Sequence, residues 1–223
     1  MATGPATQRF ETTDLLRMFP SFVWKAELAR EVFEPINVAL LAALAEIGAP
    51  LHRLAHGESW QSPHDLHERA PFAALVDCVR AAAESALDRL KIARADLAIT
   101  GCWANLNAPG AAHPEHSHPN NYLSGVYYVR TPAGADTIAF HDPRPQAAIM
   151  RPPVTALTAD NADEVMVRVR EGALLLFPAW LPHSVDANAS RDLRISFSFN
   201  LMFNAYAETM GRPLWEPGLR RRD

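Results

Sequence analysis

Three of the nine histidines lie close together, in the segment His113-Pro114-Glu115-His116-Ser117-His118. His116 and His118 are separated by one residue, and on an extended strand residues i and i+2 point to the same side. Two imidazoles would then face one point in space, which is the geometry that a transition metal requires of its first two ligands. The spacing therefore indicates a metal site, with a solvated loop that contains histidines as the alternative.

A fourth histidine follows an apolar run nearer the C-terminus, and an arginine lies beyond it at the start of the next run. His183 comes after the run 173–177 and a Pro-Trp-Pro turn, and Arg194 comes eleven residues later. That distance is enough to cross a turn and return beside His183 on a neighbouring strand. From Arg194 onward polar and apolar residues alternate, so that Arg194, Ser196, Ser198 and Asn200 share one face. This face would be solvated in an open sheet, but in a small barrel it can line a polar pocket.

The elements that must position these residues fall into two groups. Residues 19–26 are predicted to form a short strand, and Pro35 and Pro71 are predicted to open helices that reach Ile47 and about Ile92. The second helix carries an apolar stripe at helical spacing, which must cover a sheet. Its members are Phe72, Leu75, Val76, Val79, Ala83, Ala86, Leu87 and Leu90.

From residue 96 the pattern becomes one of short β-type runs divided by Gly and Pro. These runs are 97–106, 122–129, 137–140, 165–169, 173–177 and 193–201. We predict a mainly β fold with flanking α-helices, in which two N-terminal helices pack on a barrel. The expected organisation is a single domain over 1–223, with a strand and helical support in 1–95, a catalytic core in 96–204 and a tail in 205–223.

The composition excludes several function classes. With 48% hydrophobic and 21% charged residues the chain can form a packed core. Its net charge of -4 argues against nucleic-acid binding, and it has no apolar run long enough to span a membrane. Cys78 and Cys102 lack the spacing of a zinc site or redox pair, which favours a cytoplasmic location. No pattern fixes the oligomeric state.

The combination of His116-x-His118, His183 and Arg194-x-Ser196 resembles the core of the iron(II)/2-oxoglutarate-dependent oxygenases. That superfamily has HxD or HxE, then a distal histidine, then R-x-S a short distance later. The segments 118–129, 140–145 and 176–183 are similar to a bacterial and phage branch with HxH in place of HxD/E, and the match covers most of residues 97–204. The resemblance implies a double-stranded β-helix, or jelly-roll, fold.

The resemblance also implies a reaction and a set of roles. Iron(II) would be held by His116, His118 and His183, and 2-oxoglutarate would be oxidised by dioxygen to succinate while a substrate is hydroxylated. The planar, permanently charged guanidinium of Arg194 suits the far carboxylate of 2-oxoglutarate. Four further residues are expected to help bind this co-substrate: Ser196, Tyr128, Ser124 and, more weakly, Asn105.

His118 departs from the superfamily pattern, which has a carboxylate at this position. Either His118 is a direct ligand and the metal centre carries one more positive charge, or it lies outside the coordination sphere and hydrogen-bonds to it. In the second case a water or a carboxylate would complete the site, with Asp142 the first candidate. Asp142 and Arg144 lie in a Pro-flanked turn and are interpreted either as substrate contacts or as a structural ion pair.

Two other functions remain open at the level of sequence. A cupin-type three-histidine metalloenzyme would not use 2-oxoglutarate, but it would leave Arg194-x-Ser196 without a role. A ligand-binding jelly roll without catalysis would make the histidines structural. The primary substrate, a small molecule or a peptide, is not indicated by any pattern. His52, His56, His64 and His67 lack strand spacing and are predicted to lie in surface loops.

Overall fold

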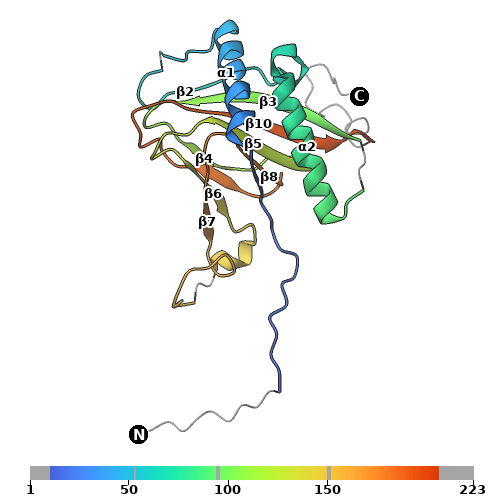
Figure 1. The fold of residues 1–223 in the computed structure, drawn as a ribbon. Helices are drawn as coiled ribbons and strands as arrows, with labels where there is room; N and C mark the ends of the chain where they lie inside the picture. Colours follow the sequence, from blue (N-terminus) through green and yellow to red (C-terminus); the bar gives the residue numbers. More distant parts are fainter. Residues whose placement is uncertain (1–10, 53, 94–95, 150–151, 206–223) are drawn as a thin grey trace, which may run out of the picture.

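Two antiparallel sheets dominate the computed structural model, which describes residues 11–52, 54–93, 96–149 and 152–205 (Figure 1). The larger sheet has the order β1-β8-β5-β10-β3-β2 and the smaller has the order β4-β9-β6-β7. The larger sheet comprises β1 (Trp24–Glu27), β8 (Ala173–Pro178), β5 (Leu123–Arg130), β10 (Arg194–Phe203), β3 (Leu97–Asn107) and β2 (Ser59–Gln61). The smaller sheet comprises β4 (His113–His116), β9 (His183–Val185), β6 (Thr137–His141) and β7 (Glu164–Arg168). This arrangement is the predicted double-stranded β-helix.

The alternation of β10 divides the molecule into a core and a pocket. Ile195, Phe197 and Phe199 are fully buried in the core cluster that the larger sheet shares with the helices. Arg194 and Ser196 point the other way, into a pocket between the two sheets. The polar face of this strand therefore lines an internal cavity, as expected for a barrel rather than an open sheet.

Both helices cover the same face of the larger sheet (Figure 1). Helix α2 (Ala73–Leu90) follows a short 3-10 turn, η2 (Ala70–Phe72), and ends at Lys91 in a left-handed conformation. The predicted apolar stripe faces the sheet and is largely buried, with Val76 and Leu90 only partly covered. The packing of helix on sheet is confirmed.

Helix α1 spans Arg30–Glu46, so the prediction that Pro35 opens it is wrong by five residues. Pro35 lies inside the helix on its exposed side, together with Glu31, whose carbonyl would have accepted the missing hydrogen bond. The first turn is held instead by Phe33, which is buried against Gly172. Tertiary packing thus extends the helix past the residue that would otherwise start it.

Three short strands were not predicted, and one was predicted too long. Strand β2 adds the Trp60-Gln61 segment to the edge of β3, while β4 and β9 pair with each other in the smaller sheet. Strand β1 begins at Trp24 rather than near residue 19. Four apolar residues of the segment before β1 do not pack against the barrel, since Leu15, Leu16, Met18 and Phe19 are exposed.

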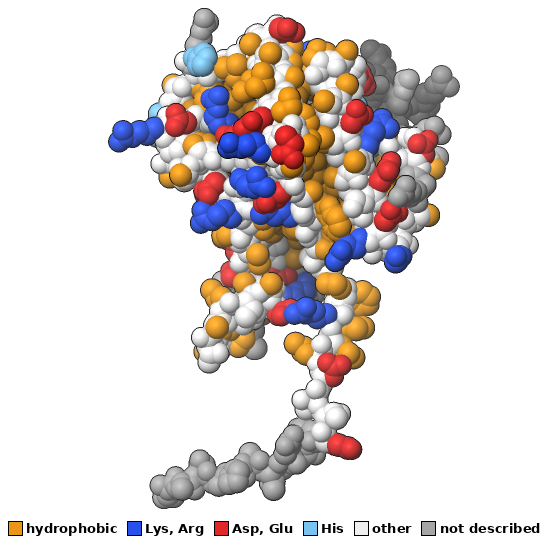
Figure 2. All heavy atoms as spheres, in the orientation of Figure 1, with side chains coloured by type: hydrophobic (Ala, Val, Ile, Leu, Met, Phe, Trp, Pro, Cys, Tyr) orange, Lys and Arg blue, Asp and Glu red, His pale blue; other side chains and the backbone are white. Residues whose placement is uncertain are grey.

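The segment between β6 and β7 projects from the end of the barrel (Figure 1). It includes the 3-10 turn η3 (Pro145–Ala148), and Asp160 within it forms an ion pair with Arg17 of the N-terminal arm at 3.2 Å. Acidic and basic side chains are interspersed over the helix-bearing face (Figure 2). Among the described helices, none has the length and apolar character needed to cross a membrane.

Candidate metal and co-substrate site

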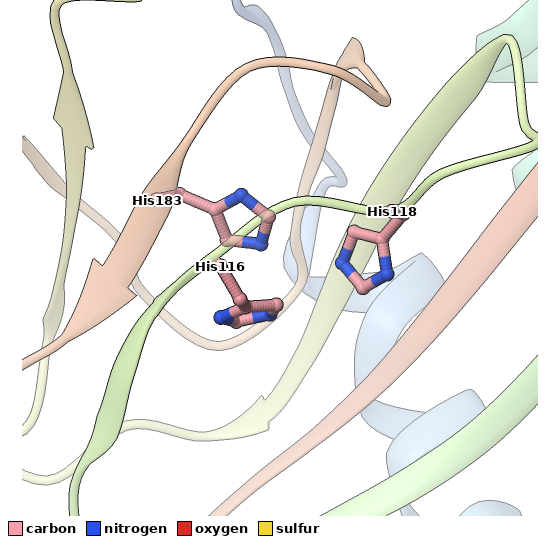
Figure 3. Close-up of side chains that lie close together, drawn as sticks. All are labelled: His116, His118 and His183. Atoms are coloured by element: carbon pink, nitrogen blue, oxygen red, sulfur yellow. The ribbon is translucent and has the colours of Figure 1, made fainter.

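Three histidines that line the pocket lie close together (Figure 3). One nitrogen of each of His116, His118 and His183 lies within 4.8 Å of the others. The ring centroids are 4.3 Å apart for His116 and His183, 5.1 Å for His116 and His118, and 5.2 Å for His118 and His183. It is the only such group of His, Cys, Asp or Glu among the residues that the structure describes. The set excludes Asp142.

The backbone places the three rings in different ways. His116 ends β4 and is the direct cross-strand partner of His183 at the start of β9. His118 lies beyond β4, so the expectation that one strand carries both members of the HxH pair is wrong. The N–H of His118 instead donates to the carbonyl of Ala179 at 2.8 Å, in the turn that leads to His183. The third ring is thus positioned by the turn between β8 and β9.

Hydrogen bonds fix the tautomers of two of these rings. Nδ1 of His116 lies 2.8 Å from the Pro114 carbonyl, and Nδ1 of His183 lies 3.0 Å from the Leu181 carbonyl. Because a carbonyl oxygen only accepts, Nδ1 carries the hydrogen in both rings and Nε2 keeps its lone pair. Such Nε2 atoms are ready metal ligands.

The protonation of the site favours metal binding. Burial lowers the pKa of His118 to about 4, with a contribution from the neighbouring His116. Burial also lowers the pKa of His183 to about 4, although its bond to Leu181 opposes the change. Both imidazoles are therefore neutral near pH 7, and neutral imidazole is the form that coordinates metals.

His141 secures the strand that carries His183. Its backbone N–H donates to the Pro182 carbonyl at 3.0 Å, and its Nε2 lies 2.8 Å from Oγ of Ser184. The two residues on either side of His183 are thus both tied to β6. On the other side of the ring, Nδ1 of His141 lies 3.6 Å from a carboxylate oxygen of Glu164.

The same pocket contains a buried cation. Arg194 is only 3% exposed and its guanidinium carbon lies 5.3 Å from the centre of the Tyr128 ring. Nε of Arg194 and the hydroxyl of Tyr128 are buried without a hydrogen-bond partner. Burial raises the pKa of Tyr128, so that its hydroxyl stays protonated. Ser196 lies between Tyr128 and Asn105, which are its cross-strand partners on β5 and β3.

Comparison with known proteins agrees with this geometry. Residues 101–200 match the family model described as "Putative 2OG-Fe(II) oxygenase", a segment that contains the three histidines and Arg194. The chain is therefore similar, over residues 101–200, to iron(II)/2-oxoglutarate-dependent oxygenases. No curated protein sequence matches it.

Several solved structures share the fold of this chain at low sequence identity. The carbocyclase SnoK from nogalamycin biosynthesis has a TM-score of 0.58 and 15% identity, over 82% of this chain and 79% of SnoK. A Trichoplax adhaerens prolyl hydroxylase has a TM-score of 0.58 and 11% identity, over 85% and 88%. A Pseudomonas putida prolyl-4-hydroxylase has a TM-score of 0.55 and 14% identity, over 82% and 93%.

Of the five residues expected to bind 2-oxoglutarate, four line the pocket and one does not. Tyr128, Ser196, Arg194 and Asn105 line the pocket. Asn105 Nδ2 donates to Ser198 Oγ at 2.9 Å, and its Oδ1 accepts from Gln61 at 2.8 Å.

Ser124 does not line the pocket, although it shares a strand face with Tyr128. It lies four residues from Tyr128 along β5, which is about 13 Å of extended chain. Its hydroxyl donates to Asn200 Oδ1 at 2.6 Å. Sharing a strand face does not bring it near Arg194.

Asp142 and Arg144 form an ion pair with each other rather than lining the pocket. Their side chains approach to 2.7 Å, and Asp142 Oδ1 also accepts from the backbone N–H of Arg144 at 3.0 Å. These contacts lower the pKa of Asp142, chiefly through the hydrogen bond from the Arg144 side chain. Of the two interpretations offered by the sequence, the geometry matches the structural ion pair.

Several residues of the pocket wall were not predicted to be there. They are Gln61, Trp103, Asn107, His113, Gly125 and four apolar residues of the two sheets, Val126, Ile138, Phe177 and Val185. Ser198 also lines the pocket, as expected from its place on the polar face of β10. Asn107 lies two residues from the predicted Asn105, so strand alternation alone could have indicated it. Gln61 and His113 reach the pocket through long-range pairing, for which the local sequence carries no signal.

The predicted surface histidines of the 52–67 segment include one beside the pocket. His52, His56 and His64 are exposed, as predicted, and His67 is half-buried. The ring of His64 stacks on Trp103 with centroids 4.4 Å apart, and Trp103 in turn lies 6.0 Å from His118. An aromatic wall therefore extends from the three-histidine cluster to the surface.

Proposed function

We propose that this protein is an iron(II)- and 2-oxoglutarate-dependent dioxygenase, which couples oxidation of 2-oxoglutarate to succinate with hydroxylation of a substrate. The observation that carries the proposal is the buried guanidinium of Arg194, which has no acidic partner among the described residues and faces the same pocket as three histidines. A buried cation without a counter-charge is costly. A carboxylate ligand would provide that counter-charge.

The three histidines fit iron(II) as the metal. Imidazole nitrogen is a preferred ligand of iron, and three ligands leave coordination positions open for small molecules. His116 and His183 present their Nε2 atoms, and His118 lies close enough for one of its ring nitrogens to be the third. When bound, the metal would supply activation of dioxygen.

The remaining residues would bind and orient 2-oxoglutarate. Arg194 would grip the far carboxylate with two parallel N–H groups, and Tyr128 would donate its unpartnered hydroxyl. Asn105, held on both sides by Gln61 and Ser198, would present a fixed amide to the near end of the molecule. The apolar side chains of Phe177 and Val126 would exclude water between the two ends.

A site of three neutral histidines differs from one with a carboxylate. No ligand neutralises the metal charge, so the complex with a dianionic 2-oxo acid is closer to neutral overall. We propose that this charge balance strengthens binding of the 2-oxo acid. Chelation by the acid would then contribute more to the affinity of the site for the metal. Affinity for iron should therefore increase when 2-oxoglutarate is present, by linkage.

The substrate is proposed to be a small molecule or a peptide that reaches the pocket past the wall formed by His64 and Trp103. The similar structures include enzymes of both kinds, since one is described as a carbocyclase and another as a prolyl hydroxylase in complex with a peptide fragment. We also propose a cytoplasmic location, because Cys78 and Cys102 are both free.

The test is anaerobic titration of the iron-loaded protein with 2-oxoglutarate, followed by measurement of succinate once oxygen is admitted. The parent should develop a visible charge-transfer band and form succinate. Arg194→Ala should retain iron but weaken 2-oxoglutarate binding by about 3 kcal/mol or more, because a charged hydrogen-bonded pair is lost. Arg194→Lys should restore binding only in part, because an ammonium group lacks the planar fork.

The result that would contradict this proposal is metal binding without the band or succinate. A cupin-type metalloenzyme would then be the better interpretation. Binding of neither metal nor oxo acid would indicate a jelly roll without catalysis. If Arg194→Ala turns over 2-oxoglutarate as fast as the parent, then Arg194 does not bind the far carboxylate of 2-oxoglutarate.

A further inference from the structure

We infer that His113 is a second, neutral hydrogen-bond donor to the far carboxylate of the co-substrate, acting beside Arg194; this inference rests on the proposed function. The sequence gives His113 no role in the metal site, and it is not a member of the three-histidine cluster. It nevertheless lines the same pocket as Arg194 and Tyr128.

The amide of Asn107 fixes which nitrogen of His113 carries the hydrogen. Asn107 Nδ2 donates one hydrogen to Ser59 Oγ at 2.9 Å and lies 2.7 Å from His113 Nε2. Since the amide nitrogen can only donate, His113 Nε2 accepts its second hydrogen. The neutral ring must then carry its own hydrogen on Nδ1, which makes Nδ1 a donor.

The strand pairing places this donor near the guanidinium. Asn107, which holds the His113 ring, is the direct cross-strand partner of Arg194 on β10. Burial lowers the pKa of His113, and the positive charge of Arg194 lowers it further. A neutral ring is the form that can share a subsite with a guanidinium without repelling it.

The donor on Nδ1 is available to a ligand. Among the described residues Nδ1 has no hydrogen-bond partner, and it is not one of the polar atoms buried without a partner, so solvent reaches it. Arg194 Nε and the Tyr128 hydroxyl are the other donors in this part of the pocket that lack partners. Three unpartnered donors on three strands suit one carboxylate, which can accept several hydrogen bonds.

Three variants of His113 separate this role from a purely structural one. Leucine removes both ring nitrogens, asparagine keeps an amide N–H near the position of Nδ1, and glutamine keeps one near the position of Nε2. The KM for 2-oxoglutarate should rise about tenfold in His113→Leu, as expected for loss of a hydrogen bond to a charged group. His113→Asn should recover most of this loss, and His113→Gln should not.

The measurement is succinate formation as a function of 2-oxoglutarate concentration, with iron affinity determined separately for each variant. Iron affinity should stay within about twofold of the parent, since the cluster is intact. His52→Leu serves as the control, because His52 is an exposed histidine outside this pocket. Its KM should equal that of the parent.

Two results would overturn the inference about His113 and leave the proposed function standing. One is an unchanged KM in His113→Leu while Arg194→Ala still raises it. The other is rescue by glutamine rather than asparagine, which would show that the bond to Asn107 matters and the Nδ1 donor does not. A parent protein that forms no succinate would overturn both the inference and the proposed function.

Discussion

The two sheets of the barrel hold the two halves of the site by different means. The larger sheet carries Arg194, Tyr128 and Asn105 on its three longest strands, of 10, 8 and 11 residues. The smaller sheet carries His116 and His183 on strands of 4 and 3 residues, one of which is interrupted by a register shift. Both helices cover the larger sheet, whereas β7 at the edge of the smaller sheet is mostly exposed.

This difference suggests that regular packing positions the proposed co-substrate residues and that local hydrogen bonds position the proposed metal ligands. Backbone pairing of β10 with both β5 and β3 sets Ser196 between Tyr128 and Asn105, with one register shift against β5 between Ile195 and Ser196. The histidines depend instead on bonds to carbonyls two residues away and on the ties from His141. Substitutions that disturb the larger sheet should therefore impair folding. Substitutions in the smaller sheet should lower metal affinity while the fold is retained.

The largest expected effect follows from placing a charge between the larger sheet and the helices that pack on it. Val79 of α2 is 1% exposed and belongs to the core cluster. Val79→Asp would bury an unpaired carboxylate and should lower the free energy of unfolding by about 4 kcal/mol or more. Thermal unfolding would measure this. Ala81→Asp, on the exposed side of the same helix, is the control for helix propensity and should change stability by less than about 1 kcal/mol.

A contrasting result is expected from the loss of a metal ligand. His183→Ala should reduce iron affinity by more than about a hundredfold, since a ligand is lost. The fold should survive, because its core lies mainly between the larger sheet and the helices. Equilibrium dialysis with iron(II) and a circular dichroism spectrum of the same sample would test both statements. Iron binding equal to that of the parent would show that His183 is not a ligand.

The sequence predicted the larger sheet better than the smaller one for a physical reason. Strands such as β10 are long enough to show alternation, and the stripe of α2 repeats over several turns. β4 and β9 have too few residues for either pattern, although they carry two of the three histidines. The fold class was therefore predictable, while the elements that present the proposed metal ligands were not.

The site was predictable in its residue types more than in its contacts. His183 and Arg194 were indicated by their spacing and by the resemblance to a known superfamily. The pairing of Asn107 with Arg194 depends on the register of β3 against β10, and the approach of His113 to Asn107 depends on how β4 of the other sheet lies across the pocket. The first contact joins residues far apart in sequence, and nothing in the local pattern of His113 distinguishes it from a loop histidine.

His118 allows a sharper test of what the smaller sheet contributes, because it lies outside any strand. If His118 is a ligand, His118→Ala should weaken iron binding strongly, and His118→Asp should restore it to within about tenfold of the parent by supplying an oxygen ligand. Iron affinity and the charge-transfer band with 2-oxoglutarate are the measurements. A small loss in His118→Ala would place this ring outside the coordination sphere.

The smallest expected effect concerns the tie between His141 and Ser184. Ser184→Ala removes a side-chain bond of 2.8 Å next to His183 but leaves the backbone bond from His141 to Pro182. We expect the free energy of unfolding to fall by only about 1 kcal/mol. Iron should nevertheless dissociate about ten times more readily, since residues that orient metal ligands affect affinity out of proportion to their effect on stability.

Competition with a chelator would measure that loss, and two further variants would show whether it arises from the tie itself. Ser184→Thr keeps a hydroxyl and should restore iron affinity. Ser190→Ala removes a hydroxyl bond of 2.6 Å to Asn188, on the connection that follows β9 but away from the histidines, and should leave iron affinity unchanged. If Ser184→Ala holds iron as the parent does, the backbone pairing of β9 is sufficient to orient His183. The smaller sheet would then position its ligands by register, as the larger sheet does, and the contrast between the two sheets would be one of strand length alone.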